Sequence, residues 1–98
     1  MFSFQSMPVY ILTKDFHYDI RRLVKKINID RITQNQLIRA SFSSMLNIAE
    51  GSGRFTKPDQ KHFYVMSRSS VFETVGILEY LKDFDIVSEE TYDSFEKR

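Results

Sequence analysis

Helix-breaking residues are scarce in this chain, and their positions constrain its fold more than any other feature of the sequence. The 98 residues include three glycines and two prolines. Gly51, Gly53 and Pro58 lie close together, Pro8 lies near the start, and Gly76 stands inside an otherwise uninterrupted stretch. The stretches between these positions are therefore long enough to form continuous helices.

The first stretch has the periodicity of an amphipathic helix. From Val9 to Ile27, apolar residues recur at spacings of four, three and one, as they do on one face of a helix. Pro8 suits the first turn, because its missing N–H would have no partner there. The apolar positions are Leu12, Phe16, Ile20, Leu23, Val24 and Ile27. We predict a helix over this range.

A second helix is predicted from Ile32 or Thr33 to Glu50, ending at Gly51 in the left-handed conformation that glycine favours. Two apolar stripes follow this range. One comprises Ile38, Phe42, Met45, Leu46 and Ala49, and the other, whose centre is small, comprises Leu37, Ser41, Ser44 and Ile48. Small residues let another backbone approach closely, so we expect this helix to lie between two neighbours.

Capping residues mark the starts of two more helices. Thr56 has the character of an N-cap, with a proline and an acidic residue in the turn after it, and the helical pattern continues to about Asp83. Ser88 is followed by two glutamates, which favour a helix N-terminus. Tyr92 and Phe95 are expected to face inward from this fourth helix.

Four helices joined by short connections predict an all-α fold, an antiparallel up-and-down four-helix bundle, in a single domain over residues 1–98. The fourth helix is short, with about 10 residues against about 24 in the third. We therefore expect exposed apolar surface along the missing half of the fourth helix. Either another copy of the chain covers this surface, or the chain has been shortened.

Composition excludes several classes of protein. Hydrophobic residues make up 42% and charged residues 28% of the chain, as in ordinary soluble domains. The absence of cysteine excludes disulfides, thiolate metal sites and cysteine nucleophiles. The longest apolar run, Met7–Leu12, is too short to cross a membrane, and no signal peptide is recognisable, so we expect a cytoplasmic protein.

No arrangement of side chains predicts catalysis. His17 and His62 do not belong to paired Glu-x-x-His metal motifs, and both are expected at the surface or at helix ends. The serines fit close contacts between helices, and none belongs to a nucleophile motif. We expect no catalytic residue, no metal and no cofactor, and therefore no enzyme.

Charge is unevenly distributed along the chain. Residues 1–70 contain eleven lysines and arginines against five acidic residues, a net charge of +6, whereas residues 71–98 have a net charge of −5. This asymmetry suggests a surface that faces a polyanion or contact between oppositely charged halves of two copies. Lys14, Arg21 and Lys25 form one line on the first helix, with Arg22 and Lys26 beside it. Such a stripe either contacts phosphates without reading bases or is an ordinary solvated face.

The string from Asn47 to Arg54 holds two of the three glycines. It could form a nest of backbone N–H groups that binds an anion, or a polar clasp that holds the turn between two helices. We favour the clasp. Glu50 is disfavoured at a helix C-terminus and needs a partner, with Arg54 and Arg39 the candidates. The residues of this motif are Asn47, Glu50, Gly51, Gly53 and Arg54.

Several strings resemble a known family of bacterial four-helix-bundle proteins, encoded in intervening sequences of large-subunit (23S) rRNA genes. The similar residues are Gln36–Ala40, Asn47–Gly51 with Gly53 and Arg54, and Phe63 followed by Ser70–Glu73. The similarity extends over about residues 36–87, and the first helix is similar only in pattern.

The resemblance implies an antiparallel four-helix bundle without known catalysis, assembled as a homopentamer. A related branch is the accessory protein of diversity-generating retroelements, which binds nucleic acid and a reverse transcriptase through a basic surface. By this resemblance, Arg39 and Arg54 are nucleic-acid contacts or partners between helices.

Two hypotheses follow. The first is a self-assembling module associated with nucleic acid or a ribonucleoprotein. Its partners are further copies of itself, RNA or DNA, and a nucleic-acid-processing protein, with no membrane. The second is a structural or protein-interaction oligomer with no nucleic-acid role. The candidate nucleic-acid contacts are Lys14, Arg21, Arg22, Lys25, Lys26, Arg39 and Arg54.

Overall fold

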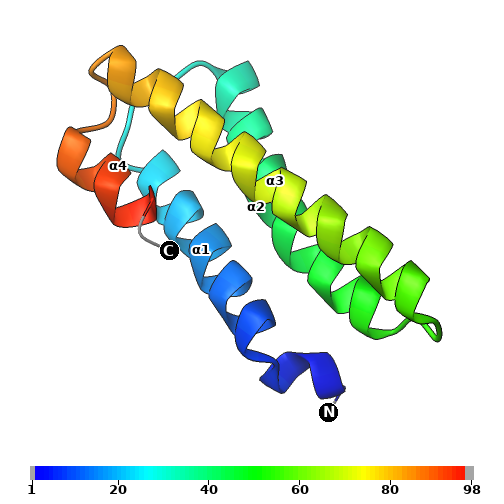
Figure 1. Cartoon of the computed structure of the whole chain (residues 1–98). Coiled ribbons are helices and arrows are strands. Elements are labelled where there is room, and N and C mark those ends of the chain that lie inside the picture. The colour runs from blue at the N-terminus through cyan, green and yellow to red at the C-terminus, as the bar shows by residue number, and fades with distance from the viewer. Residues whose placement is uncertain (1, 97–98) are drawn as a thin grey trace.

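The computed structural model describes residues 2–96 of the chain. These residues form a short 3-10 helix and four α-helices, joined antiparallel in sequence order (Figure 1). The elements are η1 (Ser3–Ser6), α1 (Pro8–Val24), α2 (Arg31–Ser52), α3 (Lys57–Asp83) and α4 (Glu89–Glu96). The prediction of an all-α bundle with a short fourth helix is confirmed.

Side-chain caps define where three of the helices begin. The side chains of Asp30, Thr56 and Ser88 each accept a hydrogen bond from the backbone N–H three residues later, at 3.0, 3.3 and 3.1 Å. Each bond satisfies an amide that has no partner inside its own helix. The caps at Thr56 and Ser88 were predicted, and the cap at Asp30 was not.

The C-terminal end of α2 differs from the prediction. The helix continues through Gly51 to Ser52, and Gly53 caps it with a right-handed backbone at φ −88°. Gly51 is therefore helical, and its prediction as a left-handed helix end was wrong. A Cβ atom on Gly51 would lie 2.7 Å from Cε1 of Tyr64, so the glycine serves the close approach of α3 and not a turn.

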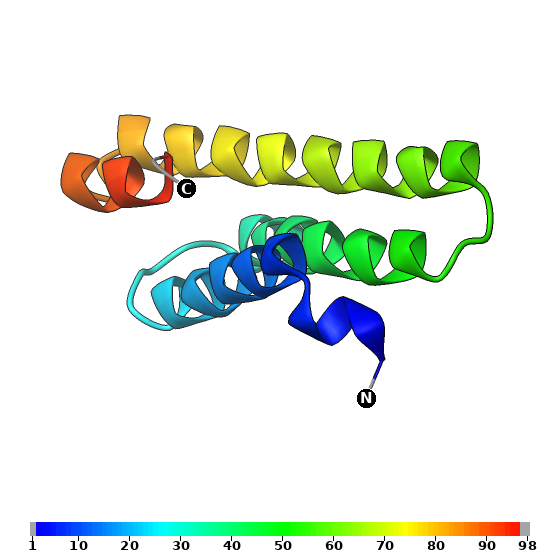
Figure 2. The same cartoon turned by 60° about the horizontal axis from the view of Figure 1, so that its bottom comes forward.

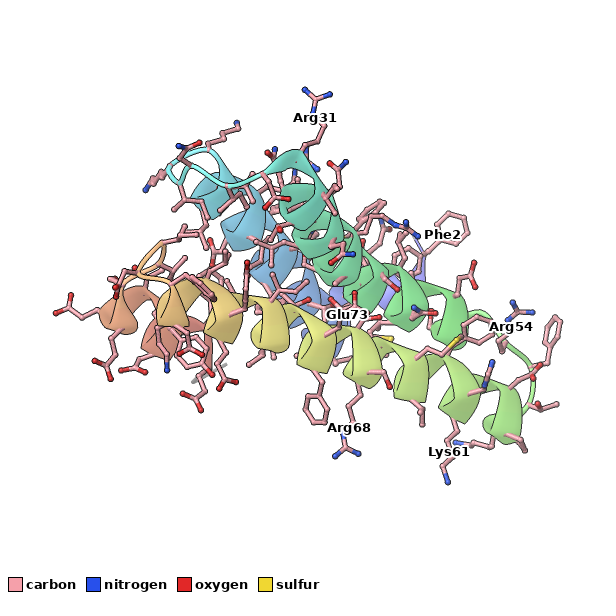
Figure 3. The ribbon with its side chains drawn as sticks, turned by 90° about the horizontal axis from the view of Figure 1, so that it is seen from above. Phe2, Arg31, Arg54, Lys61, Arg68 and Glu73 are labelled. Atoms are coloured by element: carbon pink, nitrogen blue, oxygen red, sulfur yellow. The ribbon has the colours of Figure 1, made fainter. Side chains whose placement is uncertain are left out.

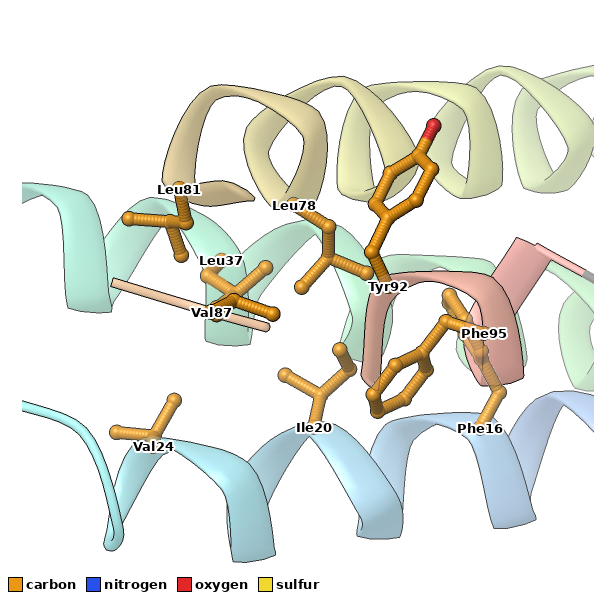
Figure 4. Close-up of a cluster of buried hydrophobic side chains, with 9 residues drawn as sticks. All are labelled: Phe16, Ile20, Val24, Leu37, Leu78, Leu81, Val87, Tyr92 and Phe95. Carbon is orange, nitrogen blue, oxygen red and sulfur yellow. The ribbon is translucent and has the colours of Figure 1, made fainter. Parts of the chain in front are cut away.

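The core gathers where all four α-helices meet (Figure 4). The rings of Phe16 on α1 and Phe95 on α4 meet edge to face, with centroids 5.8 Å apart. Tyr92 is also buried, which confirms that α4 faces inward with both aromatic residues. The core residues are Phe16, Ile20, Val24, Leu37, Leu78, Leu81, Val87, Tyr92 and Phe95.

One of the two apolar stripes of α2 is buried throughout, whereas the other buries Met45 and leaves larger apolar residues exposed. Leu37, Ser41, Ser44 and Ile48 lie in the interior, whereas Phe42 and Leu46 are each 43% exposed. The stripe that is buried throughout is the one whose central residues, Ser41 and Ser44, are small. Ser67 Oγ on α3 donates to the carbonyl oxygen of Ser44 at 2.6 Å, which holds the two helices close together.

Two residues occupy surroundings that the periodicity did not predict. Leu12 was placed on the buried face of α1 but is 50% exposed, because α4 packs further along α1 and does not cover it. His17 was expected at the surface but is only 3% exposed. Its Nδ1 atom lies 2.7 Å from Ser41 Oγ, and its ring lies 5.1 Å from that of Phe42. His62, in contrast, is exposed as expected.

Candidate nucleic-acid interface

Four exposed cations occupy the end of α1 and the residues just after it. Arg21, Arg22, Lys25 and Lys26 lie away from the apolar stripe that α1 buries. The helix dipole favours cations near a helix C-terminus, so these side chains are stabilised there without a bound ligand. Arg22 also forms an ion pair with Asp19, at 2.8 Å.

Lys14 lies on the same helix but in different surroundings. It is half-buried, and its Nζ atom lies 6.0 Å from the ring centroid of Tyr10 and 5.9 Å from that of Tyr18. Both rings therefore lie close to the ammonium group. Lys14 is therefore less available to a phosphate than the four cations at the end of α1.

Arg31 is a further exposed cation that the sequence analysis missed. It is the first residue of α2 and follows the connection from α1, and it projects outward in Figure 3. A cation at a helix N-terminus opposes the helix dipole. This unfavourable position was the signal in the sequence that could have singled it out. We call Arg21, Arg22, Lys25, Lys26 and Arg31 the α1–α2 basic end.

Arg39 lies apart from the α1–α2 basic end, in a polar hollow between α2 and α3. The hollow has a volume of about 530 Å³, and Glu73 lies on its other wall (Figure 3). The negative charge of Glu73 in the same hollow opposes the approach of a phosphate to Arg39. The lining residues are Gln36, Arg39, Ala40, Ser43, Ser70, Glu73 and Ile77.

Arg54 lies at the opposite end of the molecule from Arg31 (Figure 3). Its Nη2 atom is 3.8 Å from Oε2 of Glu50, and its guanidinium lies 4.4 Å from the ring centroid of Phe63. Of the two partners predicted for Glu50, the structure therefore places Arg54 beside it. The candidate residues do not form one continuous surface, because Arg54 is separated from the α1–α2 basic end by the length of α2.

The turn between α2 and α3 has the hydrogen bonds of a clasp. The N–H groups of Gly53 and Arg54 donate to the carbonyl oxygens of Glu50 and Gly51, at 3.1 and 3.2 Å. Gln60 Nε2 donates to the carbonyl oxygen of Arg54, at 3.0 Å. These two amides are bonded within the chain and do not point together toward an anion, which favours the clasp over the nest.

Asn47 braces α2 and does not itself bridge the two helices. Its Nδ2 atom donates to the carbonyl oxygen and to Oγ of Ser43, at 2.9 and 3.0 Å. The same Ser43 Oγ accepts a hydrogen bond from Ser70 Oγ on α3, at 3.0 Å. The link between the helices is therefore made by the serine pair.

A second group of exposed cations lies on α3. Lys57, Lys61 and Arg68 are spaced by four and seven residues, which puts them on one face of the helix. Figure 3 shows Lys61 and Arg68 projecting from the same side of α3. These three residues were not among the contacts predicted from the sequence, although their spacing could be read from it.

Acidic residues of α4 lie on a helix that packs against α1. Glu89, Glu90, Asp93 and Glu96 are exposed, and the contact between Phe16 and Phe95 joins the two helices. Figure 1 shows α4 beside the C-terminal half of α1. The basic and acidic parts of the sequence are thus neighbours in the fold, and the acidic residues oppose the attraction of a phosphate to α1.

Residues 2–96 were also considered for a metal site and for a membrane-spanning helix, and neither is present in them. They contain no group of three or more His, Cys, Asp and Glu side chains that could hold a metal ion. None of the helices in this part of the chain is both long enough and apolar enough to span a bilayer.

Comparison with known proteins bears on the family to which the chain belongs. No curated protein and no solved structure is significantly similar to the chain. The model of one protein family, described as 23S rRNA-intervening sequence protein, matches residues 5–98. This match extends over almost all of the sequence, including α1. The chain therefore belongs to the 23S rRNA-intervening sequence protein family.

Proposed function

We propose that the protein is a non-enzymatic, cytoplasmic nucleic-acid-associated module that contacts the phosphate backbone of RNA or DNA through its α1–α2 basic end. The observation that carries the proposal is the exposure of Arg21, Lys25 and Lys26 at the end of α1, with Arg31 just beyond the connection. Lysine and arginine side chains on a helix surface neutralise phosphates and release counterions without reading sequence. A family named for an intervening sequence in ribosomal RNA is a setting in which such contacts are useful.

Residues 2–96 contain one histidine–serine pair in their interior, and its inaccessibility to substrate supports a non-enzymatic role. His17 Nδ1 and Ser41 Oγ are 2.7 Å apart, a distance that a nucleophile and its base would require. Ser41 is fully buried, however, and its hydroxyl also bonds to the carbonyl oxygen of Ile38, at 3.1 Å. A substrate could not reach this hydroxyl group, so the pair is structural.

The proposal is tested by fluorescence anisotropy of a labelled structured RNA and a labelled duplex DNA, titrated with protein at several salt concentrations. We expect binding that weakens steeply between about 50 and about 200 mM salt. In a triple variant, Arg21→Gln, Lys25→Gln and Lys26→Gln, the salt dependence should flatten. Removing one phosphate contact lowers the slope of log K against log salt by about 0.9 on duplex DNA.

A matched control removes the same number of charges from α3. The variant Lys57→Gln, Lys61→Gln and Arg68→Gln has the same net charge as the α1 variant, but its substitutions lie on another helix. If the α1 surface binds the backbone, the α3 variant keeps most of the wild-type salt slope. Equal reductions in the two variants would mean that only net charge matters, and undiminished binding by the α1 variant would contradict the proposal.

We also propose that the module self-associates, as a homo-oligomer, through the outward stripe of α2. The supporting observation is that Phe42 and Leu46, one turn apart, are each 43% exposed on the same side of that helix. Sedimentation velocity over a range of protein concentrations should detect an oligomer, and Leu46→Lys should shift it toward the monomer. A wild-type protein that remains monomeric at high concentration would contradict this part of the proposal.

A further inference from the structure

The side chain of Phe55 is fully exposed, more so than any other large apolar side chain in residues 2–96. It belongs to the turn between α2 and α3, which lies at an end of the molecule to which α1 and α4 do not extend (Figure 2). Within the described part of the chain, its ring contacts no other ring and no cation. Packing inside this fold therefore does not account for an aromatic ring at this position.

The backbone on both sides of Phe55 is held by hydrogen bonds. Before it, the carbonyl oxygen of Arg54 accepts a bond from Nε2 of Gln60, at 3.0 Å. After it, Oγ1 of Thr56 accepts a bond from the N–H group of Asp59, at 3.3 Å. The exposed ring thus extends from a backbone that is already ordered, so that a ligand that contacts the ring does not have to order the turn.

Arg54, the residue before Phe55, adds a second flat group at the same turn. Its guanidinium lies 4.4 Å from the ring centroid of Phe63, and its side chain is nevertheless 45% exposed. Unpaired bases stack on aromatic rings and on the planes of arginine guanidinium groups. Two adjacent residues therefore present the two kinds of surface on which such bases stack.

The charges around Phe55 favour a nucleic-acid strand over an apolar partner. Lys57 and Lys61 are exposed one turn apart at the start of α3, and Figure 3 shows Lys61 at the same end of the molecule as Arg54. With Glu50 and Asp59, residues 50–61 contain three cations and two acidic side chains, a net charge of +1. A membrane or a protein surface would require a contiguous apolar patch, whereas a single ring among cations is typical of sites for unpaired strands.

We propose that Phe55, with Arg54 beside it, stacks on unpaired bases of a nucleic-acid strand. The proposal rests on the proposed function for the class of ligand, and it assigns a second contact with a different chemistry. Arg31 and Phe55 lie at opposite ends of α2, whose 22 residues span about 33 Å. The α1–α2 basic end would hold the phosphates of a paired stem, while the ring at Phe55 selects strands that also contain unpaired bases. Any base offers a face for stacking, so no sequence preference is expected.

The test uses a labelled DNA hairpin with a stem of about ten base pairs, or about 34 Å, and a loop of about six unpaired adenines. Fluorescence anisotropy measures its affinity for the protein. Phe55→Leu keeps an apolar side chain but removes the flat ring, and should weaken binding about fivefold or more. Phe55→Tyr keeps the ring and should bind like wild type. Phe84→Leu is the matched control, because Phe84 is 66% exposed at the other end of α3, and it should also bind like wild type.

A second hairpin separates base stacking from contact with the backbone. It has the same stem, but its loop consists of abasic nucleotides, which keep the phosphates and lack the bases. Wild-type protein and Phe55→Leu should bind this hairpin equally. With the adenine loop, the loss in Phe55→Leu should persist as salt is raised, whereas the Arg21, Lys25 and Lys26 variant flattens the salt slope on both hairpins. The stacking proposal and the proposed function can therefore fail independently.

Three results would overturn the stacking proposal. Phe55→Leu could bind the adenine-loop hairpin as tightly as wild type, which would leave the phosphate contacts of the α1–α2 basic end unaffected. Phe55→Leu could lose equal affinity for both hairpins, which would show that the ring does not contact bases. Alternatively, wild-type protein could bind vesicles of anionic phospholipid and Phe55→Ser could lose that binding, with DNA binding unchanged, which would assign the ring to a membrane surface.

Discussion

The side chain of His17 is buried on α1, with its Nδ1 atom 2.7 Å from Ser41 Oγ. Ser41 Oγ also lies 3.1 Å from the carbonyl oxygen of Ile38. The direction of the hydrogen bond between Ser41 Oγ and His17 Nδ1 depends on the tautomer of the imidazole. Burial, and next the charge of Arg21, lower the pKa of His17 below its usual value.

This lowered pKa predicts that the protein loses stability in mild acid. The unfolded chain, with an ordinary histidine pKa of about 6.5, takes up a proton at a higher pH than the folded protein. The free energy of unfolding should therefore be fully present above about pH 6.5 and fall as the pH decreases, by at most about 1.4 kcal/mol per pH unit. Urea denaturation at a series of pH values measures this slope.

The two histidines provide the control for this prediction. His17→Gln removes the titrating group, so the part of the slope between about pH 6.5 and about pH 5 should shrink even if the variant is less stable. His62→Gln, at an exposed position, is the matched control for the replacement of a histidine by glutamine. An unchanged slope in His17→Gln would assign the pH dependence to other groups.

Gly51 and Gly53 differ in what a side chain would meet. Gly51→Ala should lower the free energy of unfolding by about 1–3 kcal/mol, because its Cβ would lie 2.7 Å from Cε1 of Tyr64 and 3.0 Å from Cβ of Phe63. Gly53→Ala is the control, since its nearest neighbour would be the carbonyl oxygen of Glu50, at an ordinary 3.6 Å. Gly53→Ala should leave stability unchanged or raise it by up to about 1 kcal/mol. Equal stability of the two variants, measured by chemical denaturation, would contradict the proposed close packing.

At the scale of the elements, α2 packs against α3 on one side and α1 on the other partly through hydroxyl groups, because Ser67 Oγ of α3 bonds to the carbonyl oxygen of Ser44 and Ser41 Oγ lies 2.7 Å from Nδ1 of His17 on α1. Ser41, Ser44 and Thr74 are fully buried, and Ser67 is nearly so. Each of these hydroxyls has a hydrogen-bond partner, which removes the cost of burying them. The helices can approach closely because no long side chain separates them, and the apolar core lies at the ends of α1 and α3 near α4.

Ser67 tests how much this interface contributes. Ser67→Ala removes the 2.6 Å bond to the carbonyl oxygen of Ser44 and should lower the free energy of unfolding by about 1 kcal/mol. Ser69→Ala is the control, because Ser69 is exposed on the same helix and should change stability by less than about 0.5 kcal/mol. The difference is measured by thermal or urea unfolding, and no difference between the two would argue against an energetic role for the Ser67 bond.

At the scale of the whole molecule, the balance between the basic end of α1 and the acidic α4 determines the electrostatic potential that a polyanion meets. A variant with Glu89→Gln, Glu90→Gln and Asp93→Asn should bind RNA about two- to fivefold more tightly at low salt. The gain should disappear above about 0.3 M salt, where the charges are screened. Anisotropy titrations measure the effect, and circular dichroism verifies that α4 remains folded. Weaker binding by this variant would contradict the view that α4 opposes phosphate binding.

The sequence by itself determined the number of helices, most of their limits and the inward residues of α4. These features depend on local physics, because a cap such as Thr56 bonds to its own helix and because periodicity is a property of a single helix. The burial of Tyr92 and Phe95 was predictable for the same reason. The family was also readable from short strings such as Asn47–Gly51.

Only the tertiary structure decided which of the two apolar faces of α2 is buried throughout and which charged residues lie together. Both stripes of α2 fit the helical period, and the choice of the one through Ser44 depends on how closely α3 approaches. His17 is buried and Leu12 is half exposed because neighbouring helices cover one and not the other. Likewise, Arg39 and Arg54 separate from the α1–α2 basic end because residues distant in sequence are placed by packing, which no local pattern of side chains encodes.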